Sequence, residues 1–97
     1  MMKLSIFNSA RNREKEEKQL DQFITALLEM DSKEKMKDFL EGILTPKELQ
    51  ELPHRLGIVK MLKRGISQHD VAGKLGVGIA TVSRGSRELQ KGKFKYV

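Results

Sequence analysis

A chain of 97 residues without cysteine can form one small domain, and neither a disulfide nor a thiolate metal site can stabilise it. A domain of this size buries a limited share of its surface, so a partner chain is the expected source of further stability. No apolar run reaches the roughly 18 residues of a membrane-spanning helix, and residues 1–7 are too short and interrupted for a secretory signal. We therefore expect a cytoplasmic oligomer that has no membrane partner.

The charge is distributed unevenly along the chain. Residues 1–50 carry 9 basic and 10 acidic residues, whereas residues 51–97 carry 10 basic and 3 acidic residues. The whole formal charge of +6 therefore arises in the second half. A localised basic surface is typical of a protein that binds a polyanion such as nucleic acid. A solvated basic face without a partner explains the charge alone equally well.

Residues 1–12 show no hydrophobic periodicity, and we expect them to form a flexible tail before a single helical domain over residues 13–97. From Arg13 the sequence predicts a helix, because apolar residues recur at helical spacing and form one stripe: Leu20, Phe23, Ile24, Leu27 and Leu28. A second helix is predicted to begin at Asp31, which with Glu34 forms a capping box. Its apolar stripe consists of Met36, Phe39, Leu40 and Ile43.

A third helix is predicted with a well-marked start. Thr45 is a suitable N-cap, Pro46 suits the first helical position, and Glu48 three residues after Thr45 completes a capping box. We expect one helix that continues through Pro53 and stops near Gly65. The helices of residues 13–64 are ordinary amphipathic elements, and we expect their apolar stripes to build a dimer interface.

Residues 67–91 carry the pattern of a helix-turn-helix. Ser67 as N-cap and Asp70 begin a short helix, Gly76 ends it in a turn that favours a left-handed backbone, and a second helix runs from Ile79 to about Lys91. A small residue stands where the two helices cross (Ala72), and apolar residues stand at the positions that pack them together: Val71, Leu75, Val77 and Val82. The alternative is a pair of short helices in an ordinary bundle.

The second helix of this motif would enter the major groove of double-stranded DNA by its N-terminal end. Small and apolar side chains there can approach base edges, while the start of the first helix and the basic side chains can contact phosphate. The residues expected at the DNA are Gln68, His69, Ile79, Ala80, Thr81, Ser83, Ser86 and Arg87. Lys74 and Lys91 are further candidates for phosphate contacts, and His69 could equally be a surface residue without a role.

Gly85 departs from the helix-turn-helix pattern, because a branched apolar residue usually fills this position. The missing side chain leaves a void beside the second helix, which either a neighbouring helix or a ligand can fill.

With these residues, the chain resembles the tryptophan-operon repressor family from about Ile43 to Leu89. The resemblance depends most on Gly78-Ile79-Ala80-Thr81 followed by Arg84-Gly85-Ser86, and also on Leu44-Thr45-Pro46, Arg55, Ile58-Val59 and Ser67-Gln68. It implies an intertwined all-α homodimer whose two helix-turn-helix heads bind a palindromic operator. The chain is also similar in length to a shorter branch of the family that has no established role for tryptophan.

The resemblance further implies that L-tryptophan is the corepressor. Arg55 and Arg84 match the two arginines that flank the indole, and Gly85 leaves room for the ring. Thr45 and Arg84 match the groups that hold the ligand carboxylate, and carbonyl groups near Ile43 and Leu44 would hold its ammonium group. Glu88 stands beside that amino group, where the best-known members have serine.

Three alternatives remain open on the sequence. Glu88 could fill the pocket by pairing with Arg84 or Arg55, which would give a DNA-binding regulator without a ligand. The helix-turn-helix could instead be the DNA-recognition part of a transposase, or the chain could be a purely structural helical dimer. Carboxylates do not cluster at metal-ligand spacing, and the two histidines are His54 and His69. We therefore expect neither an enzyme nor a metal site.

Overall fold

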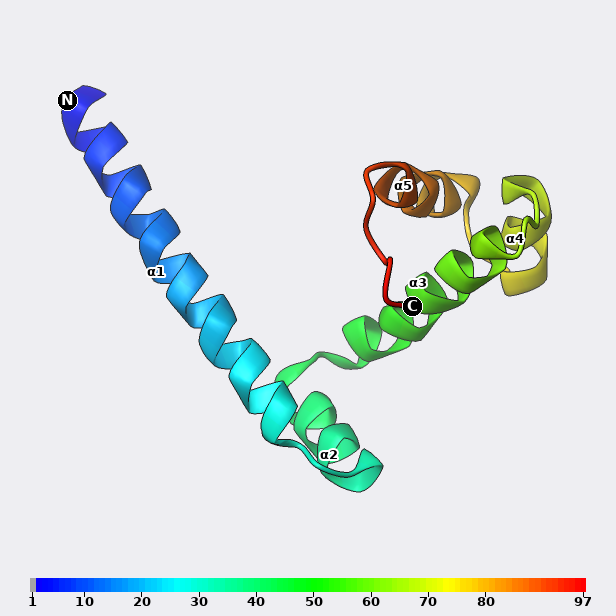
Figure 1. The fold of residues 1–97 in the computed structure, drawn as a ribbon, viewed down its shortest axis with the longest axis horizontal. Helices are drawn as coiled ribbons and strands as arrows, with labels where there is room; N and C mark the ends of the chain where they lie inside the picture. The colour runs from blue at the N-terminus through cyan, green and yellow to red at the C-terminus, as the bar shows by residue number, and fades with distance from the viewer. Residues whose placement is uncertain (1) are drawn as a thin grey trace. The chain divides into compact units, whose positions relative to one another are not determined.

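The computed structural model describes the backbone of residues 2–97 and the side chains from Ala10 onward. These residues form the all-α fold that the sequence predicts, with five helices (Figure 1): α1 (Met2–Glu29), α2 (Lys33–Ile43), α3 (Pro46–Lys63), α4 (Gln68–Leu75) and α5 (Ile79–Gln90). Over residues 2–97, none of the helices has the length and apolar character needed to cross a membrane. The chain divides into two compact units, residues 1–43 and residues 44–97.

Helix α1 begins earlier than the sequence analysis expects. The predicted flexible tail of residues 1–12 is helical from Met2 onward, and Met1 lies outside the described residues. The segment from Met2 to Glu29 contains neither glycine nor proline and is rich in Ala, Arg, Lys, Glu, Gln and Leu, which are strong helix formers. Local helix propensity therefore extends the helix, although these first residues lack an apolar stripe.

The first unit consists of α1 and α2. The N-cap of α2 is Ser32 and not the predicted Asp31, because Ser32 stands directly before the first helical residue: its Oγ accepts a hydrogen bond from the backbone N–H of Lys35 at 3.1 Å. The Asp31 carboxylate instead pairs with the Lys35 ammonium at 2.8 Å. The two helices meet through Phe23 and Phe39, whose ring centroids are 6.0 Å apart, a normal separation for an aromatic pair.

Helix α3 begins with the predicted capping box. Thr45 Oγ1 accepts from the backbone N–H of Glu48 at 3.2 Å, and the backbone N–H of Thr45 donates to Glu48 Oε1 at 2.9 Å. The helix continues through Pro53 and ends at Lys63, just before Gly65 turns the chain with a φ of 84°. These bounds agree with the start and stop signals read from the sequence.

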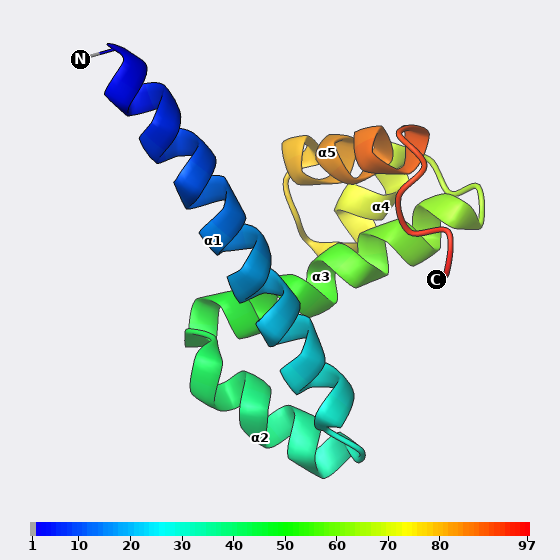
Figure 2. The ribbon, with the colours of Figure 1, turned by 60° about the vertical axis from the view of Figure 1, so that its left-hand side comes forward.

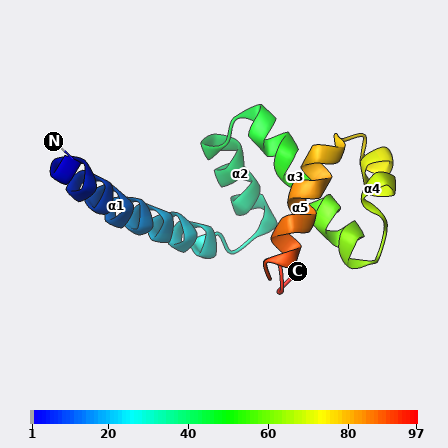
Figure 3. The ribbon, with the colours of Figure 1, turned by 90° about the horizontal axis from the view of Figure 1, so that it is seen from above.

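The second unit places α4 and α5 against α3, as Figures 2 and 3 show from two directions. Its core is formed by Ile58 of α3, Val71 of α4 and Val82 of α5, each no more than 1% exposed. The sequence analysis expects one helical domain over residues 13–97, in which residues 13–64 form the dimerisation helices. In the structure, Ile58 of α3 also shares one core with α4 and α5, and residues 44–97 form one compact unit.

Candidate DNA-binding and ligand-binding sites

Helices α4 and α5 form the pair that the sequence predicts. Ser67 caps α4 by accepting a hydrogen bond from the Asp70 backbone N–H at 3.2 Å. Gly76 ends α4 with a left-handed backbone, φ 66° and ψ 35°, which glycine adopts without a steric penalty. Residues 76–78 then turn the chain into α5. The four predicted packing residues are buried or half-buried: Val71, Leu75, Val77 and Val82.

Most of the residues predicted to contact DNA lie on the surface of this helix pair. Two of the eight are half-buried, Ser83 and Ser86, and the others are exposed: Gln68, His69, Ile79, Ala80, Thr81 and Arg87. Ser83 Oγ donates a hydrogen bond to Gln68 Oε1 at 2.9 Å and so links α5 to the start of α4. Sequence analysis did not foresee this bond. It holds Gln68 by its amide oxygen and leaves the amide N–H groups to donate elsewhere.

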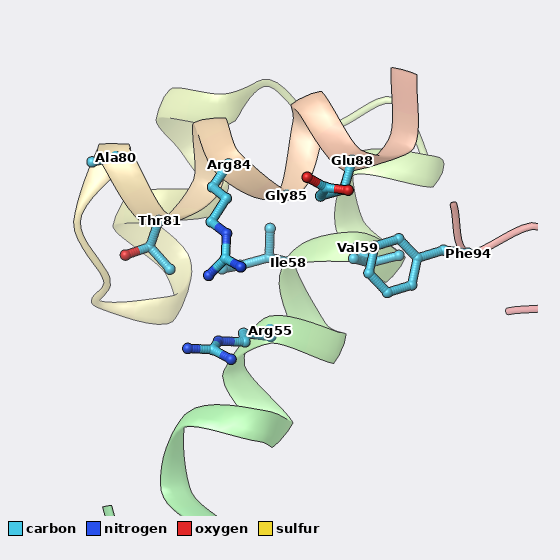
Figure 4. A pocket seen from close by; sticks show the side chains of 9 residues that line it. All are labelled: Arg55, Ile58, Val59, Ala80, Thr81, Arg84, Gly85, Glu88 and Phe94. Atoms are coloured by element: carbon cyan, nitrogen blue, oxygen red, sulfur yellow. The ribbon is translucent and has the colours of Figure 1, made fainter. Parts of the chain in front are cut away.

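A cavity of about 410 Å³ lies between α3 and α5 in the second unit. This volume falls in the range of roughly 300–1,000 Å³ that is typical of small-molecule sites. Figure 4 shows the side chains that line it: Arg55, Ile58, Val59, Ala80, Thr81, Arg84, Gly85, Glu88 and Phe94. Apolar groups form its inner wall, and two guanidinium groups and a carboxylate provide its charges.

Four of the five predicted ligand-binding residues line this cavity. Arg55 lies on α3, and Arg84, Gly85 and Glu88 lie on α5. Figure 4 shows the Arg84 side chain extending from α5 toward α3 and Arg55. Thr45 is not among the lining residues, and its hydroxyl and backbone N–H both bond to Glu48 in the capping box of α3.

The charged groups of the cavity have different ion-pair partners. The Arg55 guanidinium lies 3.6 Å from a Glu51 carboxylate oxygen. The Glu88 carboxylate lies 3.3 Å from the Lys91 ammonium, so here it pairs with its own helix end and not with either arginine. Among the residues with described side chains, Arg84 has no ion-pair partner within 4.0 Å. The arrangement therefore presents one guanidinium that is available to a carboxylate.

Gly85 lies at a close contact between α5 and α3. A Cβ atom at this position would lie 3.0 Å from Ile58 Cγ2, which is tighter than nine in ten Cβ contacts in proteins. The neighbouring helix therefore fills the void directly under Gly85, and the open volume extends along α5 between Ala80 and Glu88.

Sequence analysis missed Phe94 as a lining residue. Its ring reaches the cavity because residues 91–97 turn back after α5, where Lys63 Nζ donates to the carbonyl oxygens of Phe94 and Val97. No local pattern in the sequence indicates this contact, since Lys63 and Phe94 are 31 positions apart. Ile58 and Val59 were part of the family resemblance but were not predicted to bind the ligand.

Comparison with known proteins points to one protein family. A family model described as Trp repressor protein matches residues 18–97. A Trp operon repressor homolog of Xylella fastidiosa (strain M23) is 39% identical over 80 residues, which cover 81% of this chain and 87% of that protein. A Trp operon repressor homolog of Vibrio vulnificus (strain YJ016) is 42% identical over 71 residues, with 71% of this chain and 70% of that protein covered.

The uncharacterized protein YerC of Bacillus subtilis (strain 168) is also similar, at 33% identity over 79 residues, 81% of this chain and 76% of that protein. The family match begins within α1 and continues through α5. The alignment with the Xylella fastidiosa protein covers a similar share of the chain. The chain therefore belongs to the Trp repressor protein family, a family of DNA-binding transcriptional regulators.

Proposed function

We propose that this protein is a sequence-specific transcriptional repressor that binds operator DNA as a homodimer, with L-tryptophan as its corepressor. The observation that carries the proposal is the cavity between α3 and α5. Its lining contains Arg55, Arg84 and Glu88, and it also contains Ala80 and Thr81, which we predict to contact DNA. One helix, α5, therefore forms both a wall of the cavity and the candidate reading surface.

The proposed DNA interface is the N-terminal end of α5 together with the start of α4. Ile79 is 50% exposed at the first position of α5, and Ala80 beside it is exposed, so both can reach thymine methyl groups in a major groove. Arg87 lies in the last turn of α5 and is exposed, as expected of a residue that contacts phosphate.

The chemistry of the cavity suits an aromatic amino acid. Arg84, which has no ion-pair partner among the described side chains, can hold a carboxylate in a bidentate geometry. Glu88 can accept hydrogen bonds from an ammonium group. Ile58 and Val59 provide an apolar wall, and guanidinium groups bind the faces of aromatic rings.

Ligand binding would act on DNA affinity through α5. Ala80 and Thr81 line the cavity at the end of α5 that we expect to enter the groove. A bound ligand favours a DNA-binding arrangement only through its higher affinity for that arrangement. Contacts with the same helix on its inner face provide a physical basis for such a difference.

Exposed apolar side chains in the single chain support the proposed dimer. Six large hydrophobic residues on α1 to α3 are more than 40% exposed: Leu20, Ile24, Leu28, Ile43, Leu52 and Leu56. Soluble monomers seldom leave so many large apolar groups in water, since covering them is favourable. A symmetric dimer would place two reading heads about 34 Å apart, one turn of DNA.

A regulator without a ligand is the second candidate function. One observation favours it: Glu88 already places a carboxylate in the cavity. Membership of the Trp repressor protein family favours either form of regulator over a transposase-type DNA-recognition module.

Calorimetric titration of the purified protein with L-tryptophan tests the corepressor. We expect saturable binding by the wild type and at most a modest change in Glu88→Ser, because Glu88 would contact only the amino group. The absence of heat at millimolar ligand would refute the corepressor, and tryptophan binding gained in Glu88→Ser would establish the ligand-free alternative. Duplex DNA that is ignored at low salt, with and without tryptophan, would refute the whole proposal.

A second experiment tests which residues contact phosphate and which contact bases. Arg87→Ala should weaken binding to all DNA sequences and reduce the slope of log K against log salt by about one. Lys37→Ala, which removes an exposed lysine from α2, should leave that slope unchanged and serves as the charge-matched control. A loss of affinity for Arg87→Ala that is confined to one operator sequence would show that this arginine reads bases.

A further inference from the structure

The segment of residues 91–97 follows α5 and contributes Phe94 to the lining of the cavity. Gly92 and Phe94 both adopt positive φ angles, 90° and 62°, and these turn the segment back toward α3. Lys63 on α3 then holds it, because Lys63 Nζ donates to the carbonyl oxygen of Phe94 and, at 2.7 Å, to that of Val97. We call residues 91–97 the strap.

Two side chains of the strap act on the cavity. Lys91 pairs with the Glu88 carboxylate, a lining group, at 3.3 Å. The Phe94 ring lines the cavity together with Val59 and Glu88. Phe94 is 39% exposed, whereas Tyr96 two residues later is 93% exposed, so only the first of these two rings is partly covered by the protein.

The backbone of Phe94 indicates that its position is imposed by these contacts. A left-handed φ is uncommon for a bulky residue, and such conformations persist where the surrounding structure holds them, often at ligand clamps. Here the Lys63 hydrogen bond to the Phe94 carbonyl supplies the restraint, and the ring points at a cavity. Three observations therefore concern Phe94: the hydrogen bond from Lys63 to its carbonyl oxygen, its left-handed backbone, and the position of its ring in the cavity lining.

We propose that Phe94 is a specificity-determining residue that selects a flat aromatic side chain in the cavity, and that Lys63 is the positioning residue that latches the strap. The proposal rests on the proposed function, because it assumes that an amino acid binds between α3 and α5. Aromatic rings prefer offset-stacked or edge-to-face neighbours, which an aliphatic ligand cannot provide. Opening of the strap would remove the Phe94 ring from the cavity lining.

The test compares L-tryptophan with L-leucine as ligands of the full chain, by calorimetry. Phe94→Ala should weaken L-tryptophan binding about tenfold and leave L-leucine binding nearly unchanged, because only the aromatic ligand loses its ring contact. Tyr96→Ala removes an aromatic ring from the same strap without touching the cavity, and it should bind both ligands as the wild type does. Should Phe94→Ala fail to fold, Phe94→Leu tests the same ratio with an apolar side chain retained.

The latch is tested by Lys63→Met against Lys60→Met, an exposed lysine on the same helix. Since the chain has one tyrosine and no tryptophan, energy transfer from Tyr96 to bound tryptophan reports on the strap alone. Lys63→Met should reduce this transfer and weaken L-tryptophan binding, and Lys60→Met should change neither. Wild-type affinity for L-tryptophan in both the Phe94 and the Lys63 variants would overturn the strap proposal alone, whereas a wild type that binds no tryptophan would overturn the corepressor and the strap together.

Discussion

Gly85 shows how a single residue is chosen by packing against its neighbours. In the middle of α5, glycine lowers helix stability by roughly 0.5–1 kcal/mol relative to alanine. An added methyl group would lie 3.0 Å from Ile58 Cγ2, and Ile58 is 1% exposed, so it has little room to move away. The close approach of α3 and α5 therefore outweighs local helix propensity at this position.

Alanine at two helical glycines should give opposite effects on stability. Gly85→Ala should lower the free energy of unfolding by about 1 kcal/mol, because the cost of overpacking exceeds the gain in helix propensity. Gly73→Ala in α4 is the control: its methyl group would meet nothing within 4 Å, and it should raise the free energy of unfolding by about 0.5–1 kcal/mol. Urea denaturation at one protein concentration measures both values, and equal changes of the same sign would contradict this account of Gly85.

At the scale of one element, the start of α3 depends on the charge of Glu48. The Thr45 backbone N–H donates to the Glu48 carboxylate, and this bond lowers the pKa of Glu48 below its ordinary value. A carboxyl group whose pKa is lower in the folded state stabilises that state when it is ionised. Its contribution is therefore complete above the ordinary pKa of about 4.3 and is lost as the pH falls through the lower, folded value.

Glu48→Gln should separate this effect from general acid unfolding. The variant should be less stable than the wild type near neutral pH, and the difference should shrink as the pH falls below about 4.3, since the wild type loses the same charge. Thermal unfolding followed by circular dichroism over a pH series gives the two curves. Parallel curves for Glu48→Gln and the wild type over the whole pH series would argue against the capping role.

At the scale of the whole molecule, exposed apolar side chains on α1 suggest how two chains would associate. Leu20, Ile24 and Leu28 recur at four-residue intervals and lie on one face of the helix. Leu28 is 80% exposed in the single chain. Burial of such side chains against a partner is worth about 1.5–3 kcal/mol each, so a short stripe can drive dimer formation.

A charge placed in this stripe should prevent association. Leu28→Glu should shift the protein from dimer toward monomer, because a buried carboxylate without a partner is strongly unfavourable. Gln22→Glu places the same charge on the opposite face of α1 and should leave the dimer intact. Sedimentation equilibrium measures the mass relative to the 11.1 kDa chain, and a dimeric Leu28→Glu protein would show that this face is not the interface.

Local patterns in the sequence predicted the helices and their ends well where a side chain or a glycine sets the boundary. The Thr45–Glu48 capping box, the Ser67 cap and the left-handed Gly76 all lie where the sequence places them. Prediction failed at α1, where helix propensity without an apolar stripe gave a helix, and at α2, where Ser32 replaced Asp31 as the cap. In each case the deciding interaction spans a few residues. Asp31 and Ser32 are adjacent, and either side chain can reach a backbone N–H group in the first turn of α2.

The sequence by itself determined the helical class, the α4–α5 motif and the set of residues expected to form a binding site, because periodicity, caps and turns depend on neighbours along the chain. Only the tertiary structure decided which of those residues meet. It brought Arg55 of α3 to Arg84 and Glu88 of α5, and it added Phe94 to the cavity lining. These contacts depend on how α3, α5 and the strap pack in space, and no periodicity along the chain encodes that packing.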